Sequence, residues 1–260
     1  MVKRPAHLGA SCWGLPVYKA CAVIPVFNHG RTLPAVVAEL HKAGLACVLV
    51  DDASGADCAA VMDQLATAPD TYLLRLPLNQ GKGGAVMAGL REAGRLGFTH
   101  ALQVDADGQH NLGDVSLFIS ASQAAPDALV CGYPQYDASV PKGRLYARYL
   151  THVWVWINTL SLSIRDSMCG FRVYPLAPAL ALINHVNIGK RMDFDTEILV
   201  RLAWRNQPMQ WLPTRVHYPE DGLSHFRLWH DNALISKMHA KLFFGMLMRA
   251  PHILWQRCTS

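Results

Sequence analysis

The chain has 260 residues, 51% of them hydrophobic and 17% charged, and carries a formal net charge of +5. This composition excludes a disordered or low-complexity protein, and without a Pro-, Ser- or Gly-rich linker it favours a single globular domain. The seven cysteines are odd in number, form no C-x-x-C pair and lie mostly in apolar runs, so we expect reduced thiols in a cytosolic environment. No apolar stretch has the length of a signal peptide or of a membrane span, so we expect neither.

Apolar, strand-like runs alternate with helix-length segments along the first half of the chain. Strands are expected at residues 19–25, 46–50, 71–76, 100–104 and 129–132. Between them, apolar residues recur at helical spacing, as at 33–40. Each strand is followed by a polar or glycine-rich loop, which predicts an α/β, three-layer fold around a mostly parallel sheet. The pattern then changes to longer helices, at 144–163 and 195–205, and one further strand at 209–216.

The expected strand that ends at Val104 is followed by the carboxylates of Asp105 and Asp107 and the amide of Gln109. Open α/β sheets bind ligands at the carboxyl ends of their strands, and carboxylate and amide oxygens suit Mg²⁺ or Mn²⁺. We therefore interpret this strand end as the edge of an active site that holds a divalent metal. Short motifs of this kind also occur in solvated turns that cap a helix, and this alternative stays open.

Two further loops are expected at the same edge. Asp51 and Asp52 follow the second strand, where they contribute to the site or cap the next helix. The glycine-rich segment 79–84 follows the third strand, and its backbone N–H groups, the helix N-terminus and Lys82 together suit an anion. The spacing is not that of a P-loop, and the alternative is a glycine-rich turn with a solvated lysine.

Five motifs follow one another along the chain. They are Pro-Val-Phe-Asn at 25–28, Val-Asp-Asp-Ala-Ser at 50–54, Asn-Gln-Gly-Lys-Gly at 79–83, Asp-Ala-Asp-Gly-Gln at 105–109 and Asp-Ser-Met-Cys-Gly-Phe-Arg at 166–172. Together they closely resemble glycosyltransferase family 2, and within it the branch of dolichol-phosphate mannose synthase-like and bacterial polyprenyl-phosphate glycosyltransferases. The resemblance runs from about residue 20 to about residue 225. It implies a Rossmann-like GT-A fold and an inverting transfer of a sugar from a nucleotide-diphosphate sugar.

The resemblance implies a role for each matching position. The residues expected to bind the nucleotide-sugar are Pro25, Val26, Asn28, Asp52, Lys82, Asp105, Ala106 and Arg172. Within this set, Asp52 would bond the base and Arg172 would be available to an anionic group. The divalent cation, Mg²⁺ or Mn²⁺, would be held by Asp105, Asp107 and Gln109. Asp107 is also an expected catalytic residue, because a metal with fixed donors stabilises the charge that develops on a leaving diphosphate.

One position departs from the family pattern. Many relatives have an arginine directly after the glycine that corresponds to Gly132, whereas this chain has Tyr133. The departure puts one phosphate contact of the family in doubt, and Arg144 or Arg148 is expected to take its place. His225 lies in a polar segment that resembles a family loop able to fold over the diphosphate.

The run at 191–199 resembles an acidic helix start that lies near the acceptor in the family. If the acceptor is a hydroxyl, an inverting transfer needs a general base, and Asp195 is the first candidate and Asp193 the second. If the acceptor is a lipid phosphate, its oxygen is already anionic and no base is needed. Acids are also favoured in the first turn of a helix by the helix dipole, and this structural explanation stays open.

The C-terminal segment, residues 226–260, is expected to form a cationic amphipathic helix. From residue 222 onward the chain has five Lys or Arg residues against a single Asp. Apolar residues recur every four positions, at Leu234, Met238, Leu242 and Met246. Such a stripe suits the headgroup region of an anionic membrane, or it packs on the protein's own sheet or on a partner subunit.

These observations lead to one main hypothesis. Residues 1–225 form a glycosyltransferase domain with a nucleotide-sugar half at about 20–134 and an acceptor half at about 135–225. The enzyme transfers a sugar to polyprenyl phosphate or a related lipid, attached peripherally to the cytoplasmic face of a membrane, and does not bind nucleic acid. The alternatives are a hydroxyl acceptor, on a glycolipid, polysaccharide or small molecule, and a non-catalytic nucleotide-binding scaffold. Intact metal-ligand candidates disfavour the scaffold.

Overall fold

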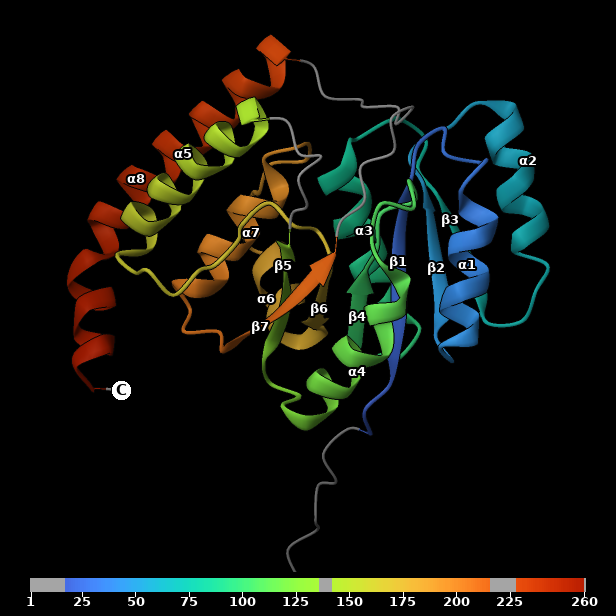
Figure 1. The fold of residues 1–260 in the computed structure, drawn as a ribbon, viewed down its shortest axis with the longest axis horizontal. Helices are drawn as coiled ribbons and strands as arrows, with labels where there is room; N and C mark the ends of the chain where they lie inside the picture. The colour runs from blue at the N-terminus through green and yellow to red at the C-terminus, as the bar shows by residue number, and fades with distance from the viewer. Residues whose placement is uncertain (1–16, 136–141, 216–227, 260) are drawn as a thin grey trace, which may run out of the picture.

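The computed structural model describes residues 17–135, 142–215 and 228–259, which form a seven-stranded sheet with helices on both faces (Figure 1). The strands are β1 Ala20–Val26, β2 Ala46–Asp51, β3 Thr71–Arg75, β4 His100–Gln103, β5 Leu129–Gln135, β6 Arg172–Pro175 and β7 Met209–Arg215. The helices are α1 Leu33–Lys42, α2 Ala56–Leu65, α3 Lys82–Arg95, α4 Val115–Ala124, α5 Lys142–Thr159, α6 Leu176–Ile183, α7 Phe194–Ala203 and α8 Leu228–Thr259. A short 3-10 helix, Leu112–Asp114, precedes α4.

The strands lie in the order β3-β2-β1-β4-β6-β5-β7. Neighbouring strands are parallel except where β6 is involved, because β6 runs antiparallel to both β4 and β5. The helices α1, α2 and α3 each lead from one strand to the next as a crossover connection, which keeps β1 to β4 parallel. The predicted mostly parallel α/β sheet is confirmed, and all five strands expected in the first half of the chain are present.

Sequence reasoning did not predict β6, although this strand lies between β4 and β5 and completes the sheet. β6 has only four residues, begins with Arg172 and ends with Pro175, so it lacks an alternating or continuous apolar pattern. Its register places Leu102 of β4 opposite Val173, and both side chains are fully buried. Burial within the sheet therefore decides the conformation of a segment whose own sequence signal is weak.

The sheet separates two hydrophobic cores. α1, α2 and α4 cover one face, with buried side chains such as Leu33, Met62 and Phe118. α3, α6 and α7 cover the other, with Leu90 and Ile198 among the buried residues. α5 and α8 lie side by side outside α7 (Figure 1) and add to this second core.

The C-terminal helix α8 is part of the packed domain. Met238, Leu242 and Met246 are buried in the core that α8 shares with α5 and α7. Lys241 donates to Glu197 Oε1 at 2.9 Å and to the Asn187 carbonyl at 2.7 Å. The predicted helix is therefore present, but its apolar stripe packs on the protein, and the expectation that this stripe faces lipid is wrong. Across the described ranges, no helix combines the length and the apolar character needed to cross a membrane.

Candidate active site

The loops after β1 and β2 are tied together at the carboxyl edge of the sheet. Asn28, which adopts a left-handed φ of 59°, accepts the N–H of Gly55 through its side-chain oxygen at 2.8 Å. Its own N–H donates to Ser54 Oγ at 3.1 Å. These bonds hold the two loops as one rim. Nearby, the side chains of Val26 and Ala106 are buried in the core, so any contact they make with a nucleotide has to come from the backbone.

Asp52 holds the glycine-rich turn before α3. Its Oδ1 accepts the N–H of Gln80 at 2.6 Å and its Oδ2 accepts the N–H of Gly81 at 2.8 Å. The side chain is buried, and this burial raises the pKa of Asp52 while the two N–H donors partly oppose the change. Both oxygens of Asp52 hold the turn, and its bond to a nucleotide base stays a prediction.

The glycine-rich turn packs tightly against the connection between α6 and α7. The N–H of Gly84 donates to the Lys190 carbonyl at 2.9 Å. A Cβ atom on Gly83 would lie 2.3 Å from Phe194 Cβ, and one on Gly81 would lie 2.8 Å from the Lys190 carbonyl oxygen. The glycines are required because another segment of the chain approaches them closely. The N–H groups of Gln80, Gly81 and Gly84 bond to the protein itself and are not available to an anion, whereas an anion site at Lys82 stays a prediction.

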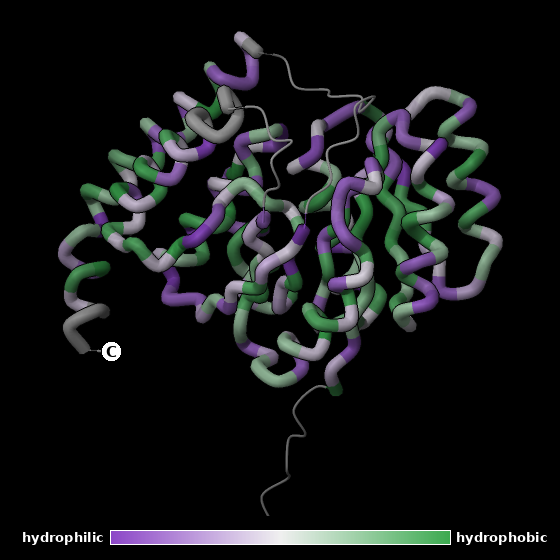
Figure 2. The backbone as a smooth tube through the Cα atoms, viewed as in Figure 1, coloured by the Kyte–Doolittle hydropathy of each residue, from purple (hydrophilic) through white to green (hydrophobic). Residues whose placement is uncertain are grey.

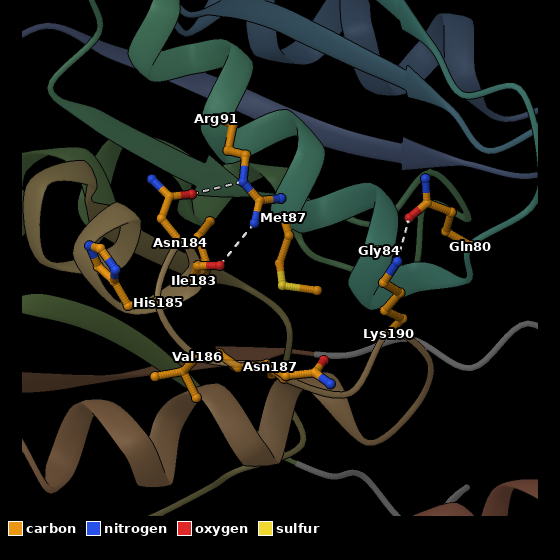
Figure 3. Close-up of a pocket in the computed structure, with 11 residues that line it drawn as sticks. Gln80, Gly84, Met87, Arg91, Ile183, Asn184, His185, Val186, Asn187 and Lys190 are labelled. Atoms are coloured by element: carbon orange, nitrogen blue, oxygen red, sulfur yellow. Dashed lines mark hydrogen bonds between the residues drawn. The ribbon is translucent and has the colours of Figure 1, made fainter.

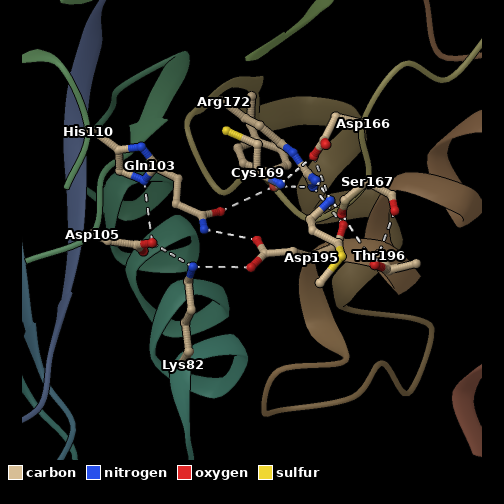
Figure 4. A network of polar contacts seen from close by, with 12 residues as sticks. Lys82, Gln103, Asp105, His110, Asp166, Ser167, Cys169, Arg172, Asp195 and Thr196 are labelled. Atoms are coloured by element: carbon tan, nitrogen blue, oxygen red, sulfur yellow. Dashed lines mark hydrogen bonds and ion pairs between the residues drawn. The ribbon is translucent and has the colours of Figure 1, made fainter. Parts of the chain in front are cut away.

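The Lys82 ammonium lies between two carboxylates (Figure 4). Its Nζ is 2.8 Å from Asp105 Oδ2 and 3.2 Å from Asp195 Oδ2. Burial alone would lower the pKa of Lys82, but the two carboxylates raise it above its usual range. Burial would likewise raise the pKa of Asp105, yet Lys82 and the nearby His110 ring hold it well below its usual range. Both members of the Lys82–Asp105 pair are therefore charged at neutral pH.

Asp195 belongs to a buried polar network that sequence reasoning only partly identified. Gln103 Nε2 donates to Asp195 Oδ1 at 3.0 Å (Figure 4). The Tyr174 hydroxyl donates to Gln103 Oε1 at 3.2 Å. Only 6% of Asp195 is exposed. Gln103 was missed by sequence reasoning. A glutamine in a strand expected to be buried was the available signal, because a buried polar side chain needs a hydrogen-bond partner.

Arg172 is fully buried, so the expectation that it is available to an anionic ligand group is wrong. Its Nη1 and Nη2 donate to the carbonyl oxygens of Asp195 and Ser167, at 2.7 and 2.8 Å, and so fix the start of β6 against α7. Asp193 is also buried, and its Oδ1 accepts the N–H of Arg191 at 3.1 Å. This bond favours the structural explanation for Asp193 over the role of second candidate base.

Arg148, one of the two arginines expected to replace the missing phosphate contact at Tyr133, is bonded to another part of the protein. Arg148 Nε donates to Asp166 Oδ2 at 2.7 Å. Although burial opposes it, the contacts from His152 and Arg148 lower the pKa of Asp166 to about 2. Arg148 thus holds the segment that follows α5. The side chain of Arg144, the other candidate, and His225 lie outside the described residues.

The residues expected to hold a metal fit a divalent cation. Asp105 Oδ1 is buried and has no hydrogen-bond partner. Burial and the neighbouring Asp105 charge raise the pKa of Asp107, whose Oδ1 accepts the N–H of Gln109 at 3.0 Å. A cation beside these two carboxylates would relieve both the unpartnered oxygen and the like-charge repulsion. In the part of the chain that the structure describes, no cluster of three His, Cys, Asp or Glu side chains could hold a metal, so ligand oxygens would complete its shell.

A cavity of about 360 Å³ lies beside the glycine-rich turn and is not lined by the carboxylates of the site (Figure 3). It is bounded by the outer face of α3 and by the connection between α6 and α7. Arg91 Nε donates to Asn184 Oδ1 at 2.9 Å and Lys190 Nζ donates to Gln80 Oε1 at 3.0 Å. Hydrogen bonds between the two segments thus lie at both ends of the cavity.

Replacing Gly83 with Ala should destabilise the protein, because the added Cβ would collide with Phe194. Overpacking of this kind typically costs about 1–3 kcal/mol. Gly94→Ala in the same helix is the matched control, since its Cβ would meet only the flexible end of Leu180, and Ala gains roughly 0.5–1 kcal/mol over Gly inside a helix. Urea unfolding should order the proteins as Gly94→Ala, wild type, Gly83→Ala. A Gly83→Ala protein as stable as wild type would show that the turn is not held by the α6–α7 connection.

Comparison with known proteins assigns this fold to a family. A family model described as glycosyl transferase family 2 matches residues 21–185. Polyprenol monophosphomannose synthase of Mycolicibacterium smegmatis is 28% identical over 174 residues, which cover 61% of this chain and 62% of that protein. Dolichyl-phosphate beta-glucosyltransferase of Drosophila melanogaster is 27% identical over 225 residues, 77% of this chain and 67% of that protein. The chain thus spans about two thirds or less of the length of these relatives.

The solved structure of glucosyl-3-phosphoglycerate synthase from Mycobacterium tuberculosis superposes with a TM-score of 0.64. The match covers 88% of this chain and 80% of that one at 13% identity, which bears on the fold alone. It confirms the expected GT-A fold. Because the family model matches more than half of the chain, the protein belongs to glycosyltransferase family 2.

Proposed function

We propose that the protein is an inverting glycosyltransferase that moves a sugar from a nucleotide-diphosphate sugar to polyprenyl phosphate or a related lipid phosphate. The choice of a phosphate acceptor over a hydroxyl acceptor rests on the contacts of the Asp195 carboxylate. One of its oxygens is paired with Lys82 and the other accepts from Gln103. A general base must offer a free oxygen to the acceptor hydroxyl. A phosphate acceptor is already anionic and needs no such base, and both relatives described above carry a polyprenyl or dolichyl phosphate acceptor in their names.

The donor diphosphate would lie over Asp105 and Asp107. These carboxylates, with the amide of Gln109, would hold Mg²⁺ or Mn²⁺, which would stabilise the negative charge on the leaving nucleoside diphosphate. Lys82 keeps Asp105 ionised and fixes its orientation. A Cβ on Gly170 would lie 2.9 Å from Lys82 Nζ and 3.5 Å from Asp105 Oδ2. The absence of a side chain at Gly170 therefore lets the segment before β6 approach the pair closely.

Asp107→Ala should abolish metal-dependent transfer while the protein remains folded, because Asp107 supplies a ligand and little packing. The control is Asp57→Ala, which removes an exposed acid at the start of α2. Transfer from a panel of nucleotide-sugars to undecaprenyl phosphate is measured with Mn²⁺ and with EDTA. Thermal unfolding with donor and Mn²⁺ should show ligand stabilisation for wild type and Asp57→Ala only. Transfer by Asp107→Ala within about tenfold of wild type, roughly 1.4 kcal/mol of barrier, would refute the metal assignment.

Asp195→Asn separates the two acceptor chemistries. A lost general base typically costs about 10² to 10⁴ in rate, whereas with a phosphate acceptor we expect a loss below this range, because only the pairing with Lys82 changes. The kcat is measured with undecaprenyl phosphate and with a glycolipid alcohol of similar chain length. Robust transfer by wild type to the alcohol, together with a large loss in Asp195→Asn, would instead establish a hydroxyl acceptor.

We also propose that the paired helices α5 and α8 attach the protein to the inner face of a membrane. Figure 2 shows hydrophobic stretches along both helices. The large apolar side chains that they expose are Tyr149, Leu150, Val153, Trp154, Ile157, Trp229, Phe244, Leu247, Met248, Leu254 and Trp255. The ring of Trp154 lies 6.2 Å from Phe243, which lies 5.8 Å from Phe244, so the two helices share this surface. Tryptophan and tyrosine favour the membrane–water interface, and apolar patches of this kind are uncommon on soluble monomers.

Liposome co-sedimentation tests this surface. The double variant Phe244→Glu, Leu247→Glu places charges on exposed positions of α8 and should shift the protein to the supernatant. Leu117→Glu, at an exposed position of α4 on the opposite side of the sheet, is the control. Vesicles are anionic or neutral, at low and high salt, because any cationic contribution weakens with salt. Wild type that stays in the supernatant under all four conditions contradicts the attachment, and vesicle-independent dimerisation would assign the surface to a partner subunit.

A further inference from the structure

Arg165 presents a positive charge at the carboxyl edge of the sheet. It is exposed, in the segment between α5 and β6, and its guanidinium carbon lies 5.3 Å from the centre of the Tyr133 ring. Tyr133 lies near the carboxyl end of β5. The contact is a cation–π interaction, which orients an arginine without using its N–H donors.

Three other cations near this edge are already engaged. Lys82 is paired with Asp105 and Asp195, Arg148 is bonded to Asp166, and Arg172 donates to buried carbonyl oxygens. For Arg165, no hydrogen bond or ion pair to another described residue is found, so its only contact there is with the Tyr133 ring. Its planar group of donors is therefore available to an anion, and this geometry suits bidentate binding of a phosphate.

The sheet register places Tyr133 level with the metal-binding carboxylates. Arg172 of β6 is opposite Gln103 of β4 on one side and opposite Cys131 of β5 on the other. Asp105 and Tyr133 each follow two residues beyond these positions, on strands that both run antiparallel to β6. Neighbouring strands are about 4.8 Å apart, so Tyr133 lies roughly 10 Å from Asp105 across the sheet edge. The cation is thus displaced from the donor diphosphate in the direction of the acceptor half.

The segment that carries Arg165 is held by hydrogen bonds and exposes two apolar side chains. Asp166 Oδ1 accepts the N–H groups of Met168 and Cys169 at 2.9 and 2.7 Å, and its Oδ2 binds Arg148. Two side chains near Arg165 in this segment are apolar and exposed, Leu162 at 78% and Met168 at 39%. A fixed cation flanked by exposed apolar groups matches a ligand with an anionic head and a hydrocarbon tail.

We propose that Arg165, held on the Tyr133 ring, binds the phosphate of the lipid acceptor. This inference rests on the proposed function and specifies its acceptor subsite. It also explains the departure at Tyr133, because the aromatic ring supports a cation that comes from another segment of the chain. The charge is supplied at the same level of the sheet, from the α5–β6 connection instead of from β5.

The test is steady-state kinetics of Arg165→Gln with farnesyl phosphate as a soluble acceptor. Loss of a charged hydrogen-bonding partner should raise the acceptor KM by about tenfold or more, with the donor KM unchanged. The control is Arg205→Gln, an exposed arginine just after α7. Tyr133→Arg in the Arg165→Gln background should restore the acceptor KM, since it places a guanidinium at the same sheet level. A merely structural role for Arg165 would not produce this rescue.

The outcomes separate the two proposals. An unchanged acceptor KM in Arg165→Gln, while wild type transfers sugar to farnesyl phosphate, overturns the role of Arg165 and leaves the proposed function intact. An equal rise in donor and acceptor KM also overturns it, because the effect is then not confined to the acceptor. Transfer by wild type to farnesol but not to farnesyl phosphate overturns the proposed function, and the role of Arg165 with it.

Discussion

The partly buried ammonium of Lys82 makes the contacts on which the arrangement of the site depends. It lies within 3.2 Å of one carboxylate from each half of the chain, Asp105 after β4 and Asp195 on α7. In this partly dry environment an unpaired charge is costly, so each of the three groups needs the others. The ion pairs of one side chain therefore connect the segment after β4 to the start of α7.

The same region is positioned by steric fit as well as by charge. Asp52 clamps the turn that begins α3, and the absence of side chains at Gly81, Gly83 and Gly84 lets the α6–α7 connection approach it. That connection leads directly into α7 and Asp195. A turn that looks like a ligand cradle in sequence thus acts as a docking surface between two parts of one chain.

Sequence reasoning predicted features that depend on neighbouring residues in the chain and missed those that depend on partners far away in sequence. The strand ending before Asp105 could be predicted because apolar periodicity and a strand-end carboxylate pair are close together in the chain. The expectations that Arg172 is available to a ligand and that the apolar stripe of α8 faces lipid were wrong for one reason. Each side chain is engaged by a segment far away in sequence, and no single-sequence pattern reports such contacts. Gln103 is an intermediate case, since a polar residue in a core strand does signal that a partner exists.

The contacts of Glu197 show that α8 belongs to the folded domain. This carboxylate is almost completely buried and binds the N–H of Gly189, the Arg201 guanidinium and the Lys241 ammonium of α8. A shorter version that stopped before α8 would leave Glu197 without one of its two cations and expose the core around Leu242. The α8 helix is therefore no detachable tail. Any fusion, split-protein design or recombination with another transferase therefore has to keep α7 and α8 together from the same parent protein.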